Sequence, residues 1–127
     1  MEIAALYAKR EGLSKFVNVE DGLKRIRNNK KLYLMIFKSF LAETHFDTLK
    51  EQIENKNFEE AVKTAHLIKG LVGNLSLDAA YEKCVFIESQ LKGGEDVTQT
   101  LADMQEIFEE TLQCIDIVLT HLDELEI

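Results

Sequence analysis

No proline occurs anywhere in the 127 residues of the chain, and glycine, the other residue that commonly ends regular structure, occurs only six times. A sheet protein of this length needs many more turn residues to connect its strands. Hydrophobic residues make up 46% of the sequence, enough for one sizeable core. We therefore expect a mostly helical protein that forms a single domain over residues 1–127.

The spacing of apolar residues predicts where the helices lie. Two short segments come first, at about 2–11, ended by Gly12, and at about 19–26, followed by a turn at Asn28 and Asn29. The main helices are expected at about 31–54, 58–75, 77–92 and 96–125. Connections this short make consecutive helices antiparallel neighbours. The predicted fold is all-α: an antiparallel up-down-up-down four-helix bundle with one or two short N-terminal helical segments.

The same periodicity predicts the core. The long helix at 31–54 should bury Leu34, Phe37, Leu41, Leu49 and Ile53. We interpret five phenylalanines as core residues rather than as parts of a cofactor site: Phe37, Phe40, Phe58, Phe86 and Phe108. Cys84 and Cys114 are thirty residues apart without a metal-binding spacing, so both are expected to be buried free thiols.

The charge of the chain restricts its partners. Fifteen basic against twenty-three acidic residues give a net charge of −8, and residues 93–127 contain ten acids but no lysine or arginine. Such a surface argues against nucleic acid or an anionic membrane and favours a protein partner. The longest apolar run, LYLMIF, is too short to cross a bilayer, and the first residues lack a signal-peptide pattern, so we expect a cytoplasmic protein.

Residues 66–75, HLIKGLVGNL, place two glycines inside a predicted helix, although each costs about 1 kcal/mol relative to alanine. On a helical wheel, Gly70 and Gly73 fall within about 40° of His66. Lys63 and Lys69 share this face, which we expect to be exposed. The opposite, buried face carries Phe58, Ala61, Ala65, Ile68, Val72 and Leu75. The glycines should therefore leave a bare patch beyond His66.

A simpler alternative is that the helix ends at Gly70 and that His66 is an ordinary surface residue. Against it, the apolar stripe continues beyond Gly70 without a change of phase. Glu88 also lies on the next helix, which must pack antiparallel to this one. A carboxylate beside one imidazole nitrogen fixes the tautomer and raises the nucleophilicity of the other nitrogen. Lys69 could then offset the charge of a phosphoryl group on His66.

The stretch TAHLIKGLVGNLSLDAAYEKCVFIESQL resembles the histidine-containing phosphotransfer (HPt) domains of two-component phosphorelays. Their signature is an alanine, the phosphorylated histidine, two residues, Lys-Gly and a further glycine. It is matched here by Ala65, His66, Lys69, Gly70 and Gly73. With the upstream stretch VEDGLKRIRNNKKLYLMIFKSFLAE, the resemblance covers about residues 17–91.

The resemblance implies a role for each matched residue. His66 would accept the phosphoryl group, Lys69 would stabilise it and Glu88 would hydrogen-bond the imidazole. A docking partner would contact Gly70, Gly73 and Lys63. Ser76 stands where many members have a third glycine, and we expect it to cap the helix that begins at Leu77.

The function implied is a phosphohistidine carrier that relays a phosphoryl group from a kinase or a receiver aspartate to another receiver. Its partners would be a sensor histidine kinase and a response-regulator receiver domain, and we expect a monomer. The chain has no nucleotide-binding motif, so it should not be an enzyme with its own ATP site. We expect no cofactor, and Mg²⁺ should belong to the receiver.

Two other functions are compatible with parts of the sequence. A helical bundle could dock a receiver or kinase through the His66 surface without phosphotransfer, and a transfer assay distinguishes the two. A metal site formed by His45, His66 and His121 is the other alternative. It lacks the Glu-x-x-His or His-x-x-x-His spacing that such sites use.

Overall fold

The computed structural model describes residues 16–120, so the helix expected at 2–11 and the end of the last helix lie outside the described residues. Within this range the chain is helical and contains no strand. The helices are α3 (Val19–Arg25), α4 (Lys30–Ala42), α5 (Phe46–Glu54), α6 (Phe58–Asn74), α7 (Asp78–Lys92) and α8 (Thr98–Thr120).

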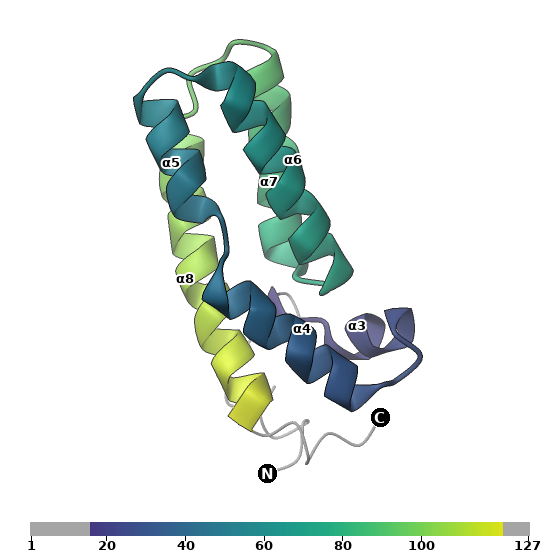
Figure 1. Cartoon of the computed structure of the whole chain (residues 1–127). Helices are drawn as coiled ribbons and strands as arrows, with labels where there is room; N and C mark the ends of the chain where they lie inside the picture. The colour runs from purple at the N-terminus through teal and green to yellow at the C-terminus, as the bar shows by residue number, and fades with distance from the viewer. Residues whose placement is uncertain (1–15, 121–127) are drawn as a thin grey trace.

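Helices α5 to α8 form the bundle and alternate in direction, up, down, up and down (Figure 1). The most extensive packing is between α6 and α7, followed by α7 with α8 and α5 with α6. An edge-to-face pair of rings, Phe46 and Phe108, joins α5 to α8 with centroids 4.9 Å apart. The predicted all-α bundle is therefore confirmed, and α6 and α7 lie side by side along most of their length.

The prediction of a single long helix at 31–54 is wrong, because the helix breaks between α4 and α5. His45 has a left-handed backbone with φ of 65°. The Glu43 carboxylate accepts a hydrogen bond from the His45 N–H at 2.6 Å, and the Thr44 hydroxyl accepts one from the Phe46 N–H at 3.3 Å. These side chains replace the carbonyl acceptors that a continuous helix would supply. Before the break, α4 crosses the lower end of the bundle and contacts α3 and α8 (Figure 1).

Helix α3 is attached to the turn between α6 and α7. The backbone N–H of Asn18 donates to the carbonyl of Ser76 at 3.0 Å, and the Asn18 side chain caps α3 by accepting from the Asp21 N–H. Gly22 packs against Tyr33 of α4, where an added Cβ would lie only 2.6 Å from the phenol oxygen. A glycine is therefore required at position 22 for α3 to approach α4 this closely.

Most of the predicted core is confirmed. Phe37, Leu49 and the α6 stripe from Ala61 to Leu75 are buried, and so are Phe40 and Phe108. Both cysteines are buried thiols that form no disulfide. Three expectations are wrong: Leu41, Phe58 and Phe86 are 40%, 47% and 51% exposed. Leu41 lies at the end of α4, where the chain leaves the bundle axis, and Phe58 is the first residue of α6. Phe86 instead lies 5.7 Å below the Lys83 ammonium.

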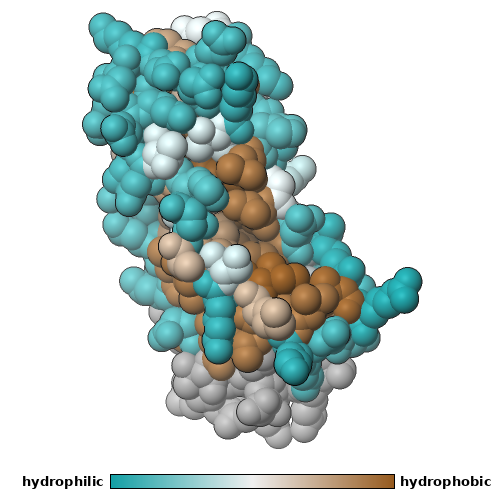
Figure 2. Space-filling model, viewed as in Figure 1, coloured by the Kyte–Doolittle hydropathy of each residue, from teal (hydrophilic) through white to brown (hydrophobic). Residues whose placement is uncertain are grey.

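Apolar side chains also gather on one outer face of the molecule. Figure 2 shows them over α4 and the adjoining part of α6. Leu32 and Met35 of α4 and Leu67 of α6 are exposed. Between these helices, a shallow groove of about 230 Å³ is lined in part by Ile36 and Leu71. In the described part of the chain, no helix is both long enough and apolar enough to span a membrane.

Candidate functional site

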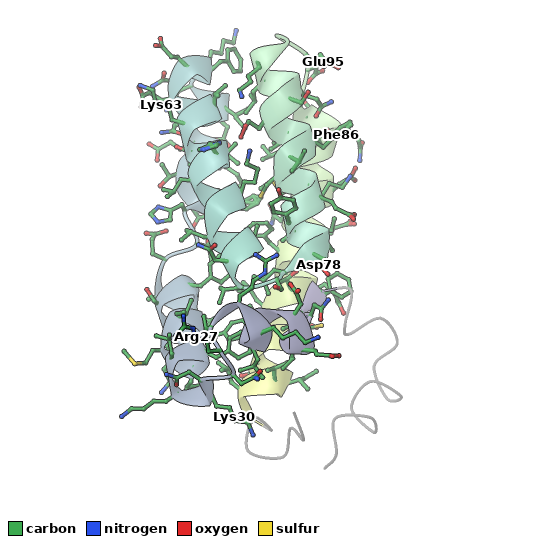
Figure 3. All side chains as sticks on the ribbon, turned by 90° about the vertical axis from the view of Figure 1, so that its right-hand side faces the viewer. Arg27, Lys30, Lys63, Asp78, Phe86 and Glu95 are labelled. Carbon is green, nitrogen blue, oxygen red and sulfur yellow. The ribbon has the colours of Figure 1, made fainter. Side chains whose placement is uncertain are left out.

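His66 lies in the middle of α6, and its imidazole contacts Glu88 of α7. Figure 3 shows these two helices side by side. Its side chain is 67% exposed, whereas that of Glu88 on α7 is 7% exposed. The imidazole Nδ1 is 3.0 Å from Glu88 Oε1. A nearly buried carboxylate thus contacts one nitrogen of a largely exposed imidazole.

Glu88 also binds two lysines. Lys69 Nζ lies 3.1 Å from Oε1 and 3.3 Å from Oε2, and Lys92 Nζ lies 3.3 Å from Oε2. Burial by itself would raise the pKa of Glu88, but hydrogen bonds from Lys69, His66 and Lys92 outweigh it and lower the pKa. Glu88 is therefore an ionised carboxylate at neutral pH, held by two cations and beside the imidazole.

The sequence reasoning identified Glu88 and Lys69 but missed Lys92. Lys92 lies four residues after Glu88 on the same helix, so the two side chains share a face of α7. That spacing could have identified it. Tyr81, seven residues before Glu88, lies two turns away on this face and was also missed.

The contact with Glu88 determines which tautomer of neutral His66 is present. An ionised carboxylate only accepts hydrogen bonds, so Nδ1 must be the donor and carry the proton. The lone pair of the neutral ring is then on Nε2, the nitrogen that does not face Glu88. The site thus presents one nucleophilic nitrogen on an exposed ring.

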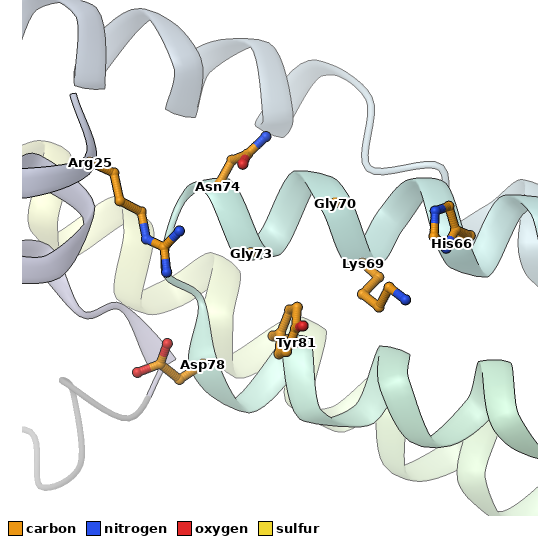
Figure 4. Close-up of a pocket in the computed structure, with 8 residues that line it drawn as sticks. All are labelled: Arg25, His66, Lys69, Gly70, Gly73, Asn74, Asp78 and Tyr81. Atoms are coloured by element: carbon orange, nitrogen blue, oxygen red, sulfur yellow. The ribbon is translucent and has the colours of Figure 1, made fainter.

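A groove of about 490 Å³ runs from His66 toward the end of α6 (Figure 4). Its lining consists of Arg25, His66, Lys69, Gly70, Gly73, Asn74, Asp78 and Tyr81. A Cβ added at Gly70 would meet no atom within 4 Å, as the predicted bare patch requires. Lys63 lies one turn before His66 and pairs with Glu60 at 3.2 Å, outside this lining.

The expectation that Gly73 faces open solvent is wrong. A Cβ at this position would lie 3.2 Å from Cδ1 and Cε1 of Tyr81. Gly73 therefore lets the Tyr81 ring of α7 lie against the backbone of α6. Of the two glycines, Gly70 leaves space open and Gly73 allows close packing.

The sequence predicted that Ser76 caps α7, and this prediction is wrong. The cap position is Leu77, which has no capping side-chain hydrogen bond, and α7 begins at Asp78. Ser76 is 2% exposed and left-handed, with φ of 57°. Its hydroxyl donates to Asp21 Oδ2 at 2.5 Å and accepts from Arg25 Nε at 3.1 Å. A glycine would take this left-handed conformation without strain, which explains why a glycine suits this position. The serine hydroxyl instead supplies the hydrogen bonds to Asp21 and Arg25.

Neither of the other two histidines is placed at the His66 site. His45 lies in the break between α4 and α5, with Nδ1 4.0 Å from Glu43, and His121 is outside the described residues. Across residues 16–120, no three His, Cys, Asp or Glu side chains come together as a possible metal site.

Comparison with known proteins gives one match, to a family. The sequence profile of the Hpt domain matches residues 35–125. No curated protein and no solved structure matches the chain. The matched range includes His66, Lys69, Glu88 and Lys92, and it leaves α3 outside. Because the match spans well over half of the chain, the protein belongs to the Hpt domain family, whose members are phosphotransfer carriers of two-component signalling.

Proposed function

We propose that this protein carries a phosphoryl group on Nε2 of His66, between a kinase or receiver aspartate and another receiver aspartate. The observation that carries the proposal is the 3.0 Å contact between Glu88 and His66 Nδ1 on a ring that is 67% exposed. One nitrogen is fixed by the protein, and the other is left for a partner. His66, Lys69 and Glu88 would be the chemical group of the site, with Lys92 as a further cation.

The chemistry follows from the tautomer. Nε2 attacks the phosphorus of an aspartyl phosphate, a phosphorus–nitrogen bond forms, and the bond from phosphorus to the aspartate oxygen breaks. The leaving group is the aspartate carboxylate, and the reverse reaction loads the next receiver. The ring becomes cationic during the attack because Nδ1 keeps its proton, and Glu88 stabilises that charge from 3.0 Å.

The phosphoryl group brings negative charge to a place that is prepared for it. Lys69 is 24% exposed and borders the groove beside His66. Lys69 can therefore offset the phosphoryl charge while Lys92 remains on Glu88. Two lysines on one carboxylate give this site the extra cation that a phosphorylated histidine needs.

The surface around His66 suits a protein partner. Gly70 leaves the groove open one turn beyond His66, and Lys63 lies exposed one turn before it. The residue after His66, Leu67, is exposed, and apolar side chains gather over α4 and the adjoining part of α6 (Figure 2). An exposed apolar patch next to a reactive group is typical of an interaction site. A receiver would bring its own Mg²⁺, and a separate kinase would use ATP. The carrier itself would act as a monomer in the cytoplasm.

The competing function is a module that docks a receiver or kinase without transfer. The test is to supply the protein with a labelled receiver phosphate and to follow the label. We expect label on the protein that is acid-labile and alkali-stable, as a phosphoramidate is. His66→Gln should take up none while its helical circular dichroism stays unchanged, because the side chain is exposed.

His45→Asn is the matched control, because asparagine tolerates the left-handed backbone at this position. It should take up label as the wild type does. Binding of the receiver by wild-type protein without any label transfer would favour the docking module. Label that persists in His66→Gln would exclude His66 as the acceptor.

A further inference from the structure

Arg25 lies at the end of the groove remote from His66 (Figure 4). It belongs to α3, so a helix outside the α6–α7 pair supplies one of the two basic residues of the lining. The other is Lys69, which is bound to Glu88. Arg25 also precedes residues 35–125, the range that the family profile matches.

The guanidinium of Arg25 is oriented through one nitrogen. Nε lies 3.0 Å from Asp21 Oδ2 and donates to the Ser76 hydroxyl at 3.1 Å. Among the described residues, the side-chain hydrogen bonds of Arg25 all involve Nε. A guanidinium has five N–H donors in a rigid plane, so its two terminal NH₂ groups remain for a ligand. The side chain is 54% exposed, and a partner can reach it.

Arg25 is too far from His66 to act on the phosphoryl group. His66 and Gly73 are seven residues apart on α6, which is about 10 Å along a helix. Arg25 binds Ser76, three residues further on. For a partner docked at His66, Arg25 would therefore be a second, separate point of contact.

Charge indicates the chemistry of that second point. Asp78, the acid at this end of the groove, accepts from Asn18 at 3.4 Å, and the chain as a whole carries a net charge of −8. A fixed, half-exposed guanidinium in an acidic protein attracts a carboxylate, and its planar NH₂ groups match both carboxylate oxygens. We propose that Arg25 recognises an acidic side chain on the docked receiver and so helps to select which receiver is served. This inference rests on the proposed function.

The test measures transfer from phosphorylated protein to increasing concentrations of its best receiver, chosen from a panel of purified receiver domains. Arg25→Ala should raise the half-saturating receiver concentration about 10-fold, because a rim charge acts on association. The maximal transfer rate should stay within about 2-fold, since Arg25 does not reach the phosphoryl group. Arg25→Lys should recover part of the affinity, and added salt should weaken the wild type more than Arg25→Ala.

Lys24→Ala is the matched control: it removes the same charge from the same helix, at a side chain that is 68% exposed and pairs with Glu20 outside the groove. It should leave both parameters unchanged. Asp21→Asn tests whether Arg25 acts only by holding α3 in place, and it should raise the half-saturating concentration less than Arg25→Ala. Equal effects of these two variants, or no effect of Arg25→Ala, would overturn the inference while transfer by the wild type still supports the carrier function. Absence of transfer by the wild type would instead refute the proposed function.

Discussion

The groove beside α6 has two ends that are built in opposite ways. At the His66 end, the imidazole is 67% exposed and Gly70 has no atom within 4 Å of where a Cβ would lie. At the other end, Gly73 is covered by the Tyr81 ring, and Ser76 is 2% exposed. The two ends lie on the same face of one helix, within ten residues. The difference indicates that the first end is kept open around His66, whereas the second holds α3, α6 and α7 together and thereby fixes Arg25 at the groove.

The packed end should show the largest effect on stability, at Ser76. Ser76→Val places a β-branched residue at φ of 57° and removes a buried hydroxyl that bridges Asp21 and Arg25. Left-handed strain and lost hydrogen bonds together should cost about 3 kcal/mol of unfolding free energy. Urea unfolding of the wild type and of Ser76→Val at neutral pH measures this loss of stability.

Ser76→Gly is the matched control for this substitution. It relieves the backbone strain but loses the same hydroxyl, so its stability should stay within about 1 kcal/mol of the wild type. The maximal rate of phosphoryl transfer, measured where each variant is folded, should change little. A Ser76→Val protein as stable as Ser76→Gly would show that the left-handed backbone at this turn is not a constraint.

How far the sequence predicted these two ends depends on the range of the interactions. The open end depends on local spacing along α6 and on one antiparallel neighbour, so His66, Lys69, Gly70 and Glu88 could be brought together from periodicity alone. The packed end depends on where α3 docks. Nothing in the spacing of residues 19–26 indicates that Arg25 reaches Ser76, because that contact joins residues 51 apart in sequence.

The break between α4 and α5 was missed for a related reason. The stretch at Glu43, Thr44 and His45 contains no glycine or proline, and its apolar pattern continues on both sides. The side chains of Glu43 and Thr44 stabilise the break by accepting hydrogen bonds from backbone N–H groups. Such side-chain bonds compete with the helix, but they leave a weaker mark in the sequence than a glycine or a proline does. The family profile, which begins at residue 35 within α4, covers the last part of that helix, the break and all of α5.

An intermediate effect is expected at the open end from Glu88→Gln, which keeps the shape of the side chain but removes its charge. Lys69 and Lys92 lose their anion, and the cationic ring loses its stabilising carboxylate. The maximal transfer rate should fall about 10-fold, as expected for one charge-assisted hydrogen bond of about 1.5 kcal/mol.

The same variant has a signature in acid. The pKa of Glu88 is lowered in the folded protein, so the carboxylate contributes stability that is fully present above its unfolded pKa of about 4.3. That contribution is lost as the pH falls through the lower, folded pKa. The stability advantage of the wild type over Glu88→Gln should therefore be present at pH 7 and shrink as the solution is acidified below the unfolded value. An advantage that is constant down to the acid limit of the folded protein would show that Glu88 is not held as a charged group.

The smallest effects, and the most direct comparison of the two ends, come from the glycines. Gly70→Ala should stabilise the protein by up to about 1 kcal/mol, because alanine is the better helix former and its Cβ meets nothing. Gly70→Gln should also fold, but its side chain would occupy the groove beside His66 and slow transfer to a receiver. Stability and transfer should thus separate at Gly70, and thermal melts with transfer assays on the three proteins measure both.

At Gly73 the gain should be smaller or absent. A Cβ there lies 3.2 Å from the Tyr81 ring, so the ring must shift by a few tenths of an ångström before alanine is accommodated. Tyr81 is 40% exposed and can shift at some cost, which subtracts from the helix propensity of alanine. Removing the ring removes that cost: in a Tyr81→Ala background, Gly73→Ala should stabilise the helix as much as Gly70→Ala does. The four unfolding free energies of this double-mutant cycle measure the coupling between Gly73 and Tyr81, which should be about 0.5 kcal/mol or more for residues in contact. Equal gains at Gly73 with and without the ring would mean that Tyr81 does not close this end of the groove, and that the two glycines serve the same purpose after all.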